Sequence, residues 1–393
     1  MKKLTFLLVG LMISTTLFSQ SCLDDVWQCL RNNQAPKAKK FIEECMNAYP
    51  DNAQVWLMKG NVYVNLYNSD QKKLNADPNY TPRYPDALMI ANEAFVKALE
   101  LDPKVQPKTG MLGAIDGQRL CADPFYEMGA KYAEKKDYEN AIKYYTLAAK
   151  NYELGKNKKN ASATYFQLAV AYFSQDKQAE GKEMLLKSIS AYPALLSASY
   201  TTLYDVYKSE KDTVNCGKIL EKGLAVFPED EDIMKAQIDY FDMTGQGEKV
   251  LALCDTMLAK KPGDLTVAAN CANYMSNAKY FQKAEEILTG LLEKNPNDFQ
   301  LNFQMAYRYF MEVVEYEDKI DAAMKAKQYA EVNPLRTAEK EIIQKAHDWS
   351  QKAYDINGNV QQNNIMLQQL KVKLLIPVPE ELKAKVDSYR HQN

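Results

Sequence analysis

Apolar residues recur at helical spacing along most of the chain, in pairs of runs that a short polar turn separates. From Pro124 to Pro296 this double pattern repeats at intervals of roughly 34 residues. Pro193, Pro228 and Pro262 stand at the ends of successive intervals, just beyond an apolar run. Because proline lacks the backbone donor and clashes with the preceding turn, each of them should end a helix. One interval therefore predicts one hairpin of two antiparallel helices.

The clearest copy of the pattern runs from Pro124 to Lys150, with its turn at 135–137. The positions that define this copy are Phe125, Met128, Gly129, Tyr132, Ala141, Tyr145 and Ala148. We expect Gly129 and Ala141 to face each other where the two helices cross, because small residues let two backbones approach closely.

These positions resemble those of the tetratricopeptide repeat, with Met128 in the place of its leucine. The same positions recur in four further copies, as Leu168, Ala169, Tyr172 and Gly181; Leu203, Tyr204, Tyr207 and Cys216; Gln237, Ile238, Phe241 and Val250; and Cys271, Ala272, Met275 and Ala284. The resemblance implies an all-α solenoid of αα-hairpins, coiled as a right-handed superhelix. The helix expected over Gln361–Leu375 is apolar on one side only, as the C-terminal cap of a solenoid should be.

The segments around the regular copies predict interruptions. Prolines in Asn68–Pro85 predict an inserted loop, and glycines in Lys104–Leu120 predict an irregular joint. Asn333-Pro334 predicts a break between helices, within an insertion over 313–340. The expected parts are a signal peptide (1–21), N-terminal hairpins with the inserted loop (22–121), the regular array (122–298), a degenerate hairpin with a long insertion (299–358), and a cap and tail (359–393).

The first residues of the chain have the features of a secretory signal. Met1–Ser21 holds two lysines, an apolar run too short to span a bilayer, and small residues at its end. We therefore expect an exported protein, in the periplasm of a Gram-negative bacterium or held in the cell envelope as a lipoprotein.

Cys22 has two alternative fates. Cleavage after Ser21 would leave Cys22 first, as a lipid anchor requires, although Ser19 stands where such signals usually have leucine. A disulfide between Cys22 and Cys45, which should lie opposite each other in the first hairpin, would exclude acylation of the same sulfur. The sequence leaves these two outcomes open.

Charge and chemistry exclude several classes of function. The chain has 49 basic and 51 acidic residues and no basic stripe, so we expect no nucleic-acid partner. No apolar run after the signal is long enough for a transmembrane span. Only His347 and His391 are present, and each is expected to be a solvated side chain. Since the known catalytic and metal-binding motifs are missing, we expect no catalytic residue, no metal and no cofactor.

The resemblance also implies a binding surface, because the first helices of tetratricopeptide hairpins line a concave groove that holds partner peptides. Helix spacing selects as its candidate residues Tyr126, Phe166, Val170, Phe173, Asp205, Asp239, Asp242, Asn273, Asn277, Phe303 and Tyr307. The alternative for the aromatic members is packing between neighbouring hairpins.

Together these features predict a non-catalytic scaffold or adaptor of the cell envelope that binds a protein or peptide through this groove. The alternative is a surface glycan-binding protein built on the same hairpins. Such proteins devote more chain to loops, and Trp27, Trp56 and Trp349 are not expected to cluster as a sugar platform.

Overall fold

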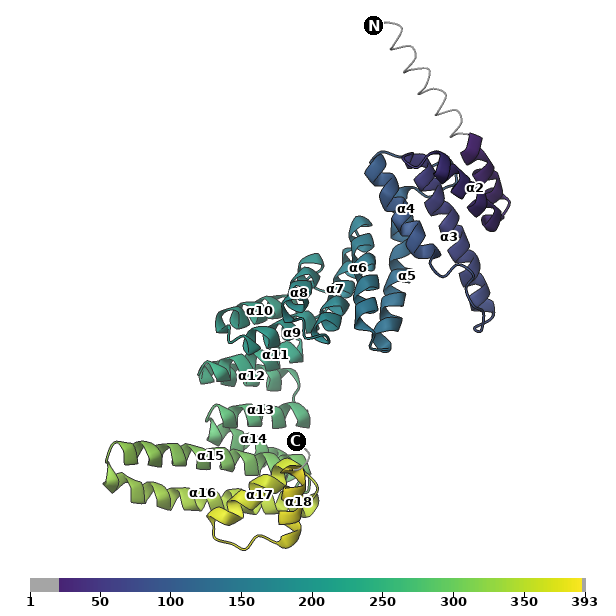
Figure 1. Ribbon diagram of the computed structural model, residues 1–393. Helices are drawn as coiled ribbons and strands as arrows, with labels where there is room; N and C mark the ends of the chain where they lie inside the picture. Colours follow the sequence, from purple (N-terminus) through teal and green to yellow (C-terminus); the bar gives the residue numbers. More distant parts are fainter. Residues whose placement is uncertain (1–20, 391–393) are drawn as a thin grey trace. The chain divides into compact units, whose positions relative to one another are not determined.

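The computed structural model describes residues 21–390 (Figure 1). Within that part of the chain all regular secondary structure is helical and no strand occurs, which confirms the all-α hairpin solenoid. The chain divides into two compact units between Asp212 and Thr213, a boundary within the array predicted over 122–298.

The first unit begins with a helix over 21–31. It continues with α2 (Ala35–Ala48), α3 (Ala53–Ala76), α4 (Ala87–Leu101), α5 (Ala114–Glu134), α6 (Tyr138–Leu154), α7 (Lys158–Phe173), α8 (Gln178–Ala191) and α9 (Ala198–Ser209). Successive helices pack against each other from α2 to α9.

The second unit holds α10 (Thr213–Val226), α11 (Glu231–Met243), α12 (Gly247–Lys260), α13 (Leu265–Asn277), α14 (Phe281–Lys294), α15 (Phe299–Lys325), α16 (Tyr329–Ile356), α17 (Gln361–Lys373) and α18 (Glu380–Arg390). Here too each helix packs against the next, and α13 also packs against α15. Figure 1 shows α15 and α16 side by side as a long hairpin, with α17 folded back over α16.

Short-range chemistry explains the regular helix ends. Helices α8, α10, α12 and α14 all stop before the prolines that mark the sequence period, as predicted. Helices α6, α7, α11, α13 and α15 each begin after an Asp or Asn whose side chain accepts hydrogen bonds from the first free backbone N–H groups. The turn at 135–137 lies where the sequence places it, and Lys136 there has a φ of 60°.

The close helix crossing at Gly129 has a different partner from the one predicted. A Cβ added to Gly129 would lie 2.7 Å from Cδ1 of Tyr145, so the tyrosine ring, not Ala141, covers the glycine. Ala141 is fully buried one turn earlier on α6 and shares the same face. In the next hairpin Phe173 covers Gly181 in the same way, 2.4 Å from where a Cβ would be.

Two prolines that were expected at helix boundaries or breaks lie inside helices. Pro124 and Pro334 lie within α5 and α16, so the helix of the predicted joint begins at Ala114 and no break follows Asn333. Each proline leaves one carbonyl without its helical partner, four residues earlier at Leu120 and Ala330. Both of those residues are exposed, so water can satisfy the freed carbonyls.

Two predicted insertions are therefore mostly helix. Helix α3 continues to Ala76, and only the segment 77–86 remains a loop of the predicted Asn68–Pro85 insertion. That loop folds back onto α3, where buried Asp70 accepts hydrogen bonds from the hydroxyl of Tyr80 and the backbone N–H of Tyr84, each 2.7 Å long. The insertion at 313–340 is the outer part of the α15–α16 hairpin, with a single turn after Lys325.

The N-terminal hairpin is covalently closed. Cys22 and Cys45 form a disulfide, with their Cα atoms 5.9 Å apart, at the edge of a core that includes Val26 and Ile42. The predicted signal peptide lies outside the described residues, except for Ser21, and His391 lies outside them as well. Among the described residues, no helix has both the length and the apolar character needed to cross a membrane.

Candidate functional site

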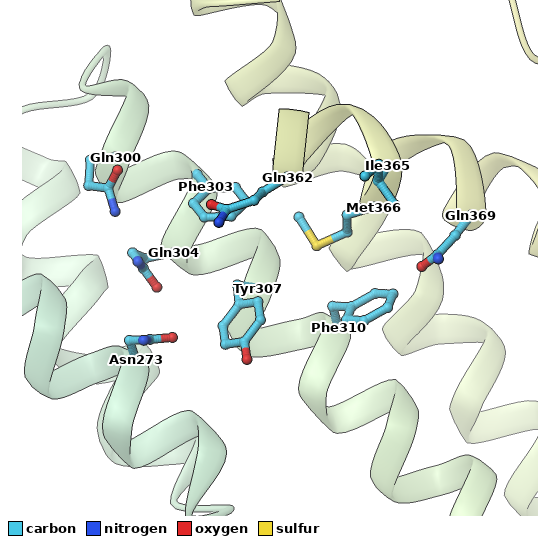
Figure 2. Close-up of a pocket in the computed structure, with 10 residues that line it drawn as sticks. All are labelled: Asn273, Gln300, Phe303, Gln304, Tyr307, Phe310, Gln362, Ile365, Met366 and Gln369. Carbon is cyan, nitrogen blue, oxygen red and sulfur yellow. The ribbon is translucent and has the colours of Figure 1, made fainter. Parts of the chain in front are cut away.

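A cavity of about 490 Å³ lies in the second unit, between α13, α15 and the cap helix α17 (Figure 2). It is lined by Asn273, Gln300, Phe303, Gln304, Tyr307, Phe310, Gln362, Ile365, Met366 and Gln369. The volume falls within the roughly 300–1,000 Å³ usual for ligand pockets.

Helix α15 supplies the floor of this cavity. It begins at Asp298, whose carboxylate accepts a 2.9 Å hydrogen bond from the N–H of Leu301. Its five lining residues, from Gln300 to Phe310, follow helical spacing and share one face. Another side of the helix is anchored by Arg308, which is 5% exposed and forms ion pairs with Glu285 and Glu312. The rotation of α15 is therefore fixed, and its amide and aromatic side chains point at the cap.

Helix α17 forms the opposite wall, and buried polar contacts hold it on α16. The hydroxyl of Ser350 donates to the side-chain oxygen of Asn363 at 2.8 Å, and the amide of Asn363 donates back to the Ser350 carbonyl at 3.0 Å. Lys371 Nζ lies 3.3 Å from Nε2 of His347, and both residues are buried. The expectation of a solvated His347 was wrong, because the folding back of the cap places Lys371 over it.

The polar and apolar residues of the lining are unevenly distributed. Figure 2 shows Gln300, Gln304 and Asn273 toward one side of the cavity, and Phe310, Ile365, Met366 and Gln369 toward the other. None of the described residues that line it carries a charge.

Tyr307 stays neutral between these two sides. Its hydroxyl donates a 2.9 Å hydrogen bond to the side-chain oxygen of Asn277. Burial, with a smaller contribution from the carboxylate of Asp242, raises the pKa of Tyr307. The ring of Tyr307 is thus held in place and available as a contact surface.

Gln304 is the unusual member of the lining. Its side chain is 7% exposed, and its Oε1 has no hydrogen-bond partner among the described residues. Leaving a buried acceptor without a donor costs about 1–3 kcal/mol. Since the terminal torsion of glutamine is soft, the amide can rotate to present its oxygen to the cavity. The oxygen itself is buried in the conformation of the structure, and after that rotation it would be available to accept a hydrogen bond from a bound molecule.

The structure brings four of the predicted groove residues together here. Asn273, Phe303 and Tyr307 line the cavity, and Asn277 holds Tyr307 from behind. Asp239 and Asp242 belong to α11 and do not line it.

The predicted residues of the first unit form a separate set. The ring of Tyr126 lies 5.4 Å from that of Tyr145, and Phe173 covers Gly181, so both aromatic rings pack within their own hairpins. Val170 is 42% exposed on α7, where Phe166 is half-buried, and Asp205 is exposed on α9.

Spacing did not identify the cap residues or Gln304 as part of a site. The sequence feature that could have identified Gln304 is its place on an otherwise apolar helix face, between Leu301 and Met305. The signal for Gln362 and Gln369 was weaker, because amides on a terminal helix usually face water. Groups of three or more His, Cys, Asp or Glu that could hold a metal ion are not found among residues 21–390.

Residues 162–195 match the family model described as tetratricopeptide repeat. This segment contains most of α7 and all of α8. No curated protein matches the chain.

Among solved structures, pilF of Pseudomonas aeruginosa is 14% identical, with 67% of this chain and 96% of that chain covered and a TM-score of 0.30. A TPR repeats protein from Bacteroides fragilis is 15% identical, with 64% and 98% covered and a TM-score of 0.28. The TPR domain of P58(IPK) is 12% identical, with 91% and 98% covered and a TM-score of 0.26. Likenesses this low identify no partner.

Proposed function

We propose that the chain is a non-catalytic scaffold for protein–protein interaction, as the tetratricopeptide-repeat match at 162–195 suggests. Its cavity between α15 and α17 would bind an uncharged, extended segment of a partner polypeptide. The observation that carries this proposal is the lining itself, in which five amide side chains and three aromatic rings surround the unpartnered oxygen of Gln304.

The amide side chains match the chemistry of a peptide backbone. Each glutamine or asparagine side chain offers both a donor and an acceptor, and so does each backbone peptide unit. An extended chain presents its N–H and C=O groups to both sides, which fits a cavity with α15 below and α17 above. The free acceptor of Gln304 would then take a backbone N–H.

The apolar residues of the lining would contact a side chain of the same segment. Phe310, Ile365 and Met366 offer ring and aliphatic surface without a competing charge. Methionine adapts its shape to different apolar partners. A charged side chain would lose its hydration here without gaining an opposite charge, so the segment should be neutral over its bound residues.

We place this activity outside the cytoplasm. The signal-like residues Met1–Ser21 support export, and the disulfide between Cys22 and Cys45 supports an oxidising compartment. With that sulfur in a disulfide, Cys22 would not carry an acyl chain, so we propose a periplasmic protein rather than a lipoprotein.

A neutral glycan is the second candidate ligand. The amide side chains of the lining could bind sugar hydroxyls, and the half-buried rings of Phe303 and Phe310 could stack on a sugar ring. The aliphatic side chains of Met366 and Ile365 favour a peptide, since they offer a sugar neither a hydrogen-bond partner nor an aromatic ring.

Selection of random 12-residue peptides displayed on phage, against the full chain, tests the proposal. We expect the bound peptides to share an uncharged core with one large apolar residue, and fluorescence anisotropy should show that Phe310→Ala abolishes their binding. Val372→Ala is the matched control, because Val372 is 60% exposed on α17 and does not line the cavity.

Peptides that bind Phe310→Ala as well as they bind the unaltered chain would contradict the proposal. A panel of neutral oligosaccharides, measured with the same variants, decides the second candidate. Binding of oligosaccharides alone, lost in Phe310→Ala, would replace the peptide by a glycan.

A further inference from the structure

Two cysteines of the second unit face each other across consecutive hairpins. Cys254 lies on α12 and Cys271 on α13, and both are fully buried. The Sγ of Cys254 lies 3.9 Å from the carbonyl oxygen of Cys271, and the Sγ of Cys271 lies 3.8 Å from the carbonyl oxygen of Cys254. Each sulfur thus reaches past the other residue's side chain to its backbone.

The reciprocal contacts place the two cysteine side chains against each other. A disulfide requires Cα atoms about 4.4–6.8 Å apart and Cβ atoms that point toward each other, so two cysteines in mutual contact are the candidates for one. Cys29 and Cys121, which also have free thiols, lie in the first unit on other helices.

We propose that Cys254 and Cys271 are the site of a second disulfide, which joins one hairpin to the next when the chain folds in an oxidising medium. The proposal stands independently of the ligand of the cavity. Both thiols are free in the structure, whereas Cys22 and Cys45 are already paired.

The chemistry is thiol–disulfide exchange with an oxidised low-molecular-weight disulfide such as glutathione disulfide. The thiolate of one cysteine attacks the oxidant and releases one reduced thiol. The second cysteine then attacks the mixed disulfide and releases the other. One S–S bond forms between the two Sγ atoms and the S–S bond of the oxidant breaks; the two electrons and the two thiol protons end on the two thiols that are released.

Burial of the two thiols determines the stage of folding at which this exchange can take place. Both thiols are fully buried, so an oxidant cannot reach either sulfur once the unit has folded. The exchange should therefore occur while α12 and α13 are still docking. Afterwards the disulfide would be shielded from reductants by the same burial.

Such a disulfide would act on the helix that carries one wall of the cavity. Cys271 and Asn273 are two residues apart on α13, and Asn273 lines the cavity. Linking α13 to α12 would restrict movement of α13 away from its neighbour.

The test is a peptide map of the full chain, refolded from the reduced, denatured state in a glutathione redox buffer and alkylated under denaturing conditions. Trypsin should release residues 250–260 and 261–279 as one linked pair that separates on reduction. Cys121→Ser should leave the pair linked, and Cys254→Ser should leave Cys271 alkylated.

Alkylation of both Cys254 and Cys271 in the refolded unaltered chain overturns the proposal, whether or not Cys22 and Cys45 are linked. A link from either residue to another cysteine overturns it as well. A second measurement concerns stability: reduction should lower the melting temperature of the unaltered chain by more than that of the variant with both Cys254→Ser and Cys271→Ser. Equal shifts would mean that no second disulfide was present.

Discussion

Replacing Gln304 by methionine should stabilise the second unit, because it removes an acceptor that has no donor. Gln304 is 7% exposed and its Oε1 is unpartnered in the described part of the chain. An unsatisfied buried acceptor costs about 1–3 kcal/mol, and we take the lower end because the side chain borders an open cavity. Methionine has a similar length and adapts to irregular space. We therefore expect a gain of about 1 kcal/mol, or a melting temperature higher by roughly 2–4 °C.

The assay combines thermal melting of the full chain with hydrogen exchange of the α15 amides, which reports on the second unit alone. Gln300→Met is the matched control, because Gln300 lies one turn earlier on the same helix and is exposed. That change should leave the stability within about 0.5 kcal/mol of the unaltered chain.

The reasoning would be refuted if Gln304→Met melted earlier than Gln300→Met, since the glutamine would then be making a contact worth more than its unpaired oxygen costs. A selected peptide adds a second readout. Gln304→Met should weaken peptide binding and stabilise the free protein. A glutamine with a structural role alone would not produce these two opposite effects.

Three further predictions concern other parts of the chain. Gly129→Leu should lower the unfolding free energy by about 1–3 kcal/mol, because leucine would overpack against the Tyr145 ring. Gly290→Ala, which has open space at its Cβ, should instead raise it by up to about 1 kcal/mol. Urea denaturation measures both, and equal effects would contradict the close contact between Gly129 and Tyr145. Phe173→Ala should lower the unfolding free energy by about 3–5 kcal/mol, because the ring packs within its hairpin. An unchanged melting temperature would instead support a role of Phe173 in partner binding. Burial and the neighbouring carboxylate of Asp239 raise the pKa of Asp242, so the folded chain holds this proton more tightly than the unfolded chain does. Stability therefore falls as the pH rises from the usual aspartate pKa of 3.8 to the folded pKa. Asp242→Asn should therefore raise the melting temperature at about pH 7 but not at about pH 3, and a gain of the same size at both would refute the sign.

The helical hairpins could be predicted because residues close in sequence determine where each helix begins and ends. A proline just after an apolar run, or an Asp before one, acts on its own turn and needs no distant partner. Pro124 and Pro334 misled the prediction because their cost depends on whether the freed carbonyl reaches water. That depends on the exposure of Leu120 and Ala330, which is a property of the fold.

The candidate site could be predicted only on the side that helix spacing controls. Asn273, Phe303 and Tyr307 were chosen by their positions on first helices, and they do meet. The opposite wall depends on α17 folding back over α16, which the buried contact between Ser350 and Asn363 fixes. No spacing rule relates residues of those two helices to α15.

The long hairpin of α15 and α16 has a small core of its own at the outer end, where Ile320, Ala323 and Val332 are buried against the partly buried Leu335. So few apolar contacts can hold the outer turns only weakly, whereas the inner turns share the main core of the unit. The hairpin should therefore open from its tip inward, with amide protection that decreases step by step along both helices. The length of this hairpin can then be changed without altering the cavity. Removing one helical turn from α15 and one from α16 near Ala326 would shorten the hairpin and leave Gln300 to Phe310 in place.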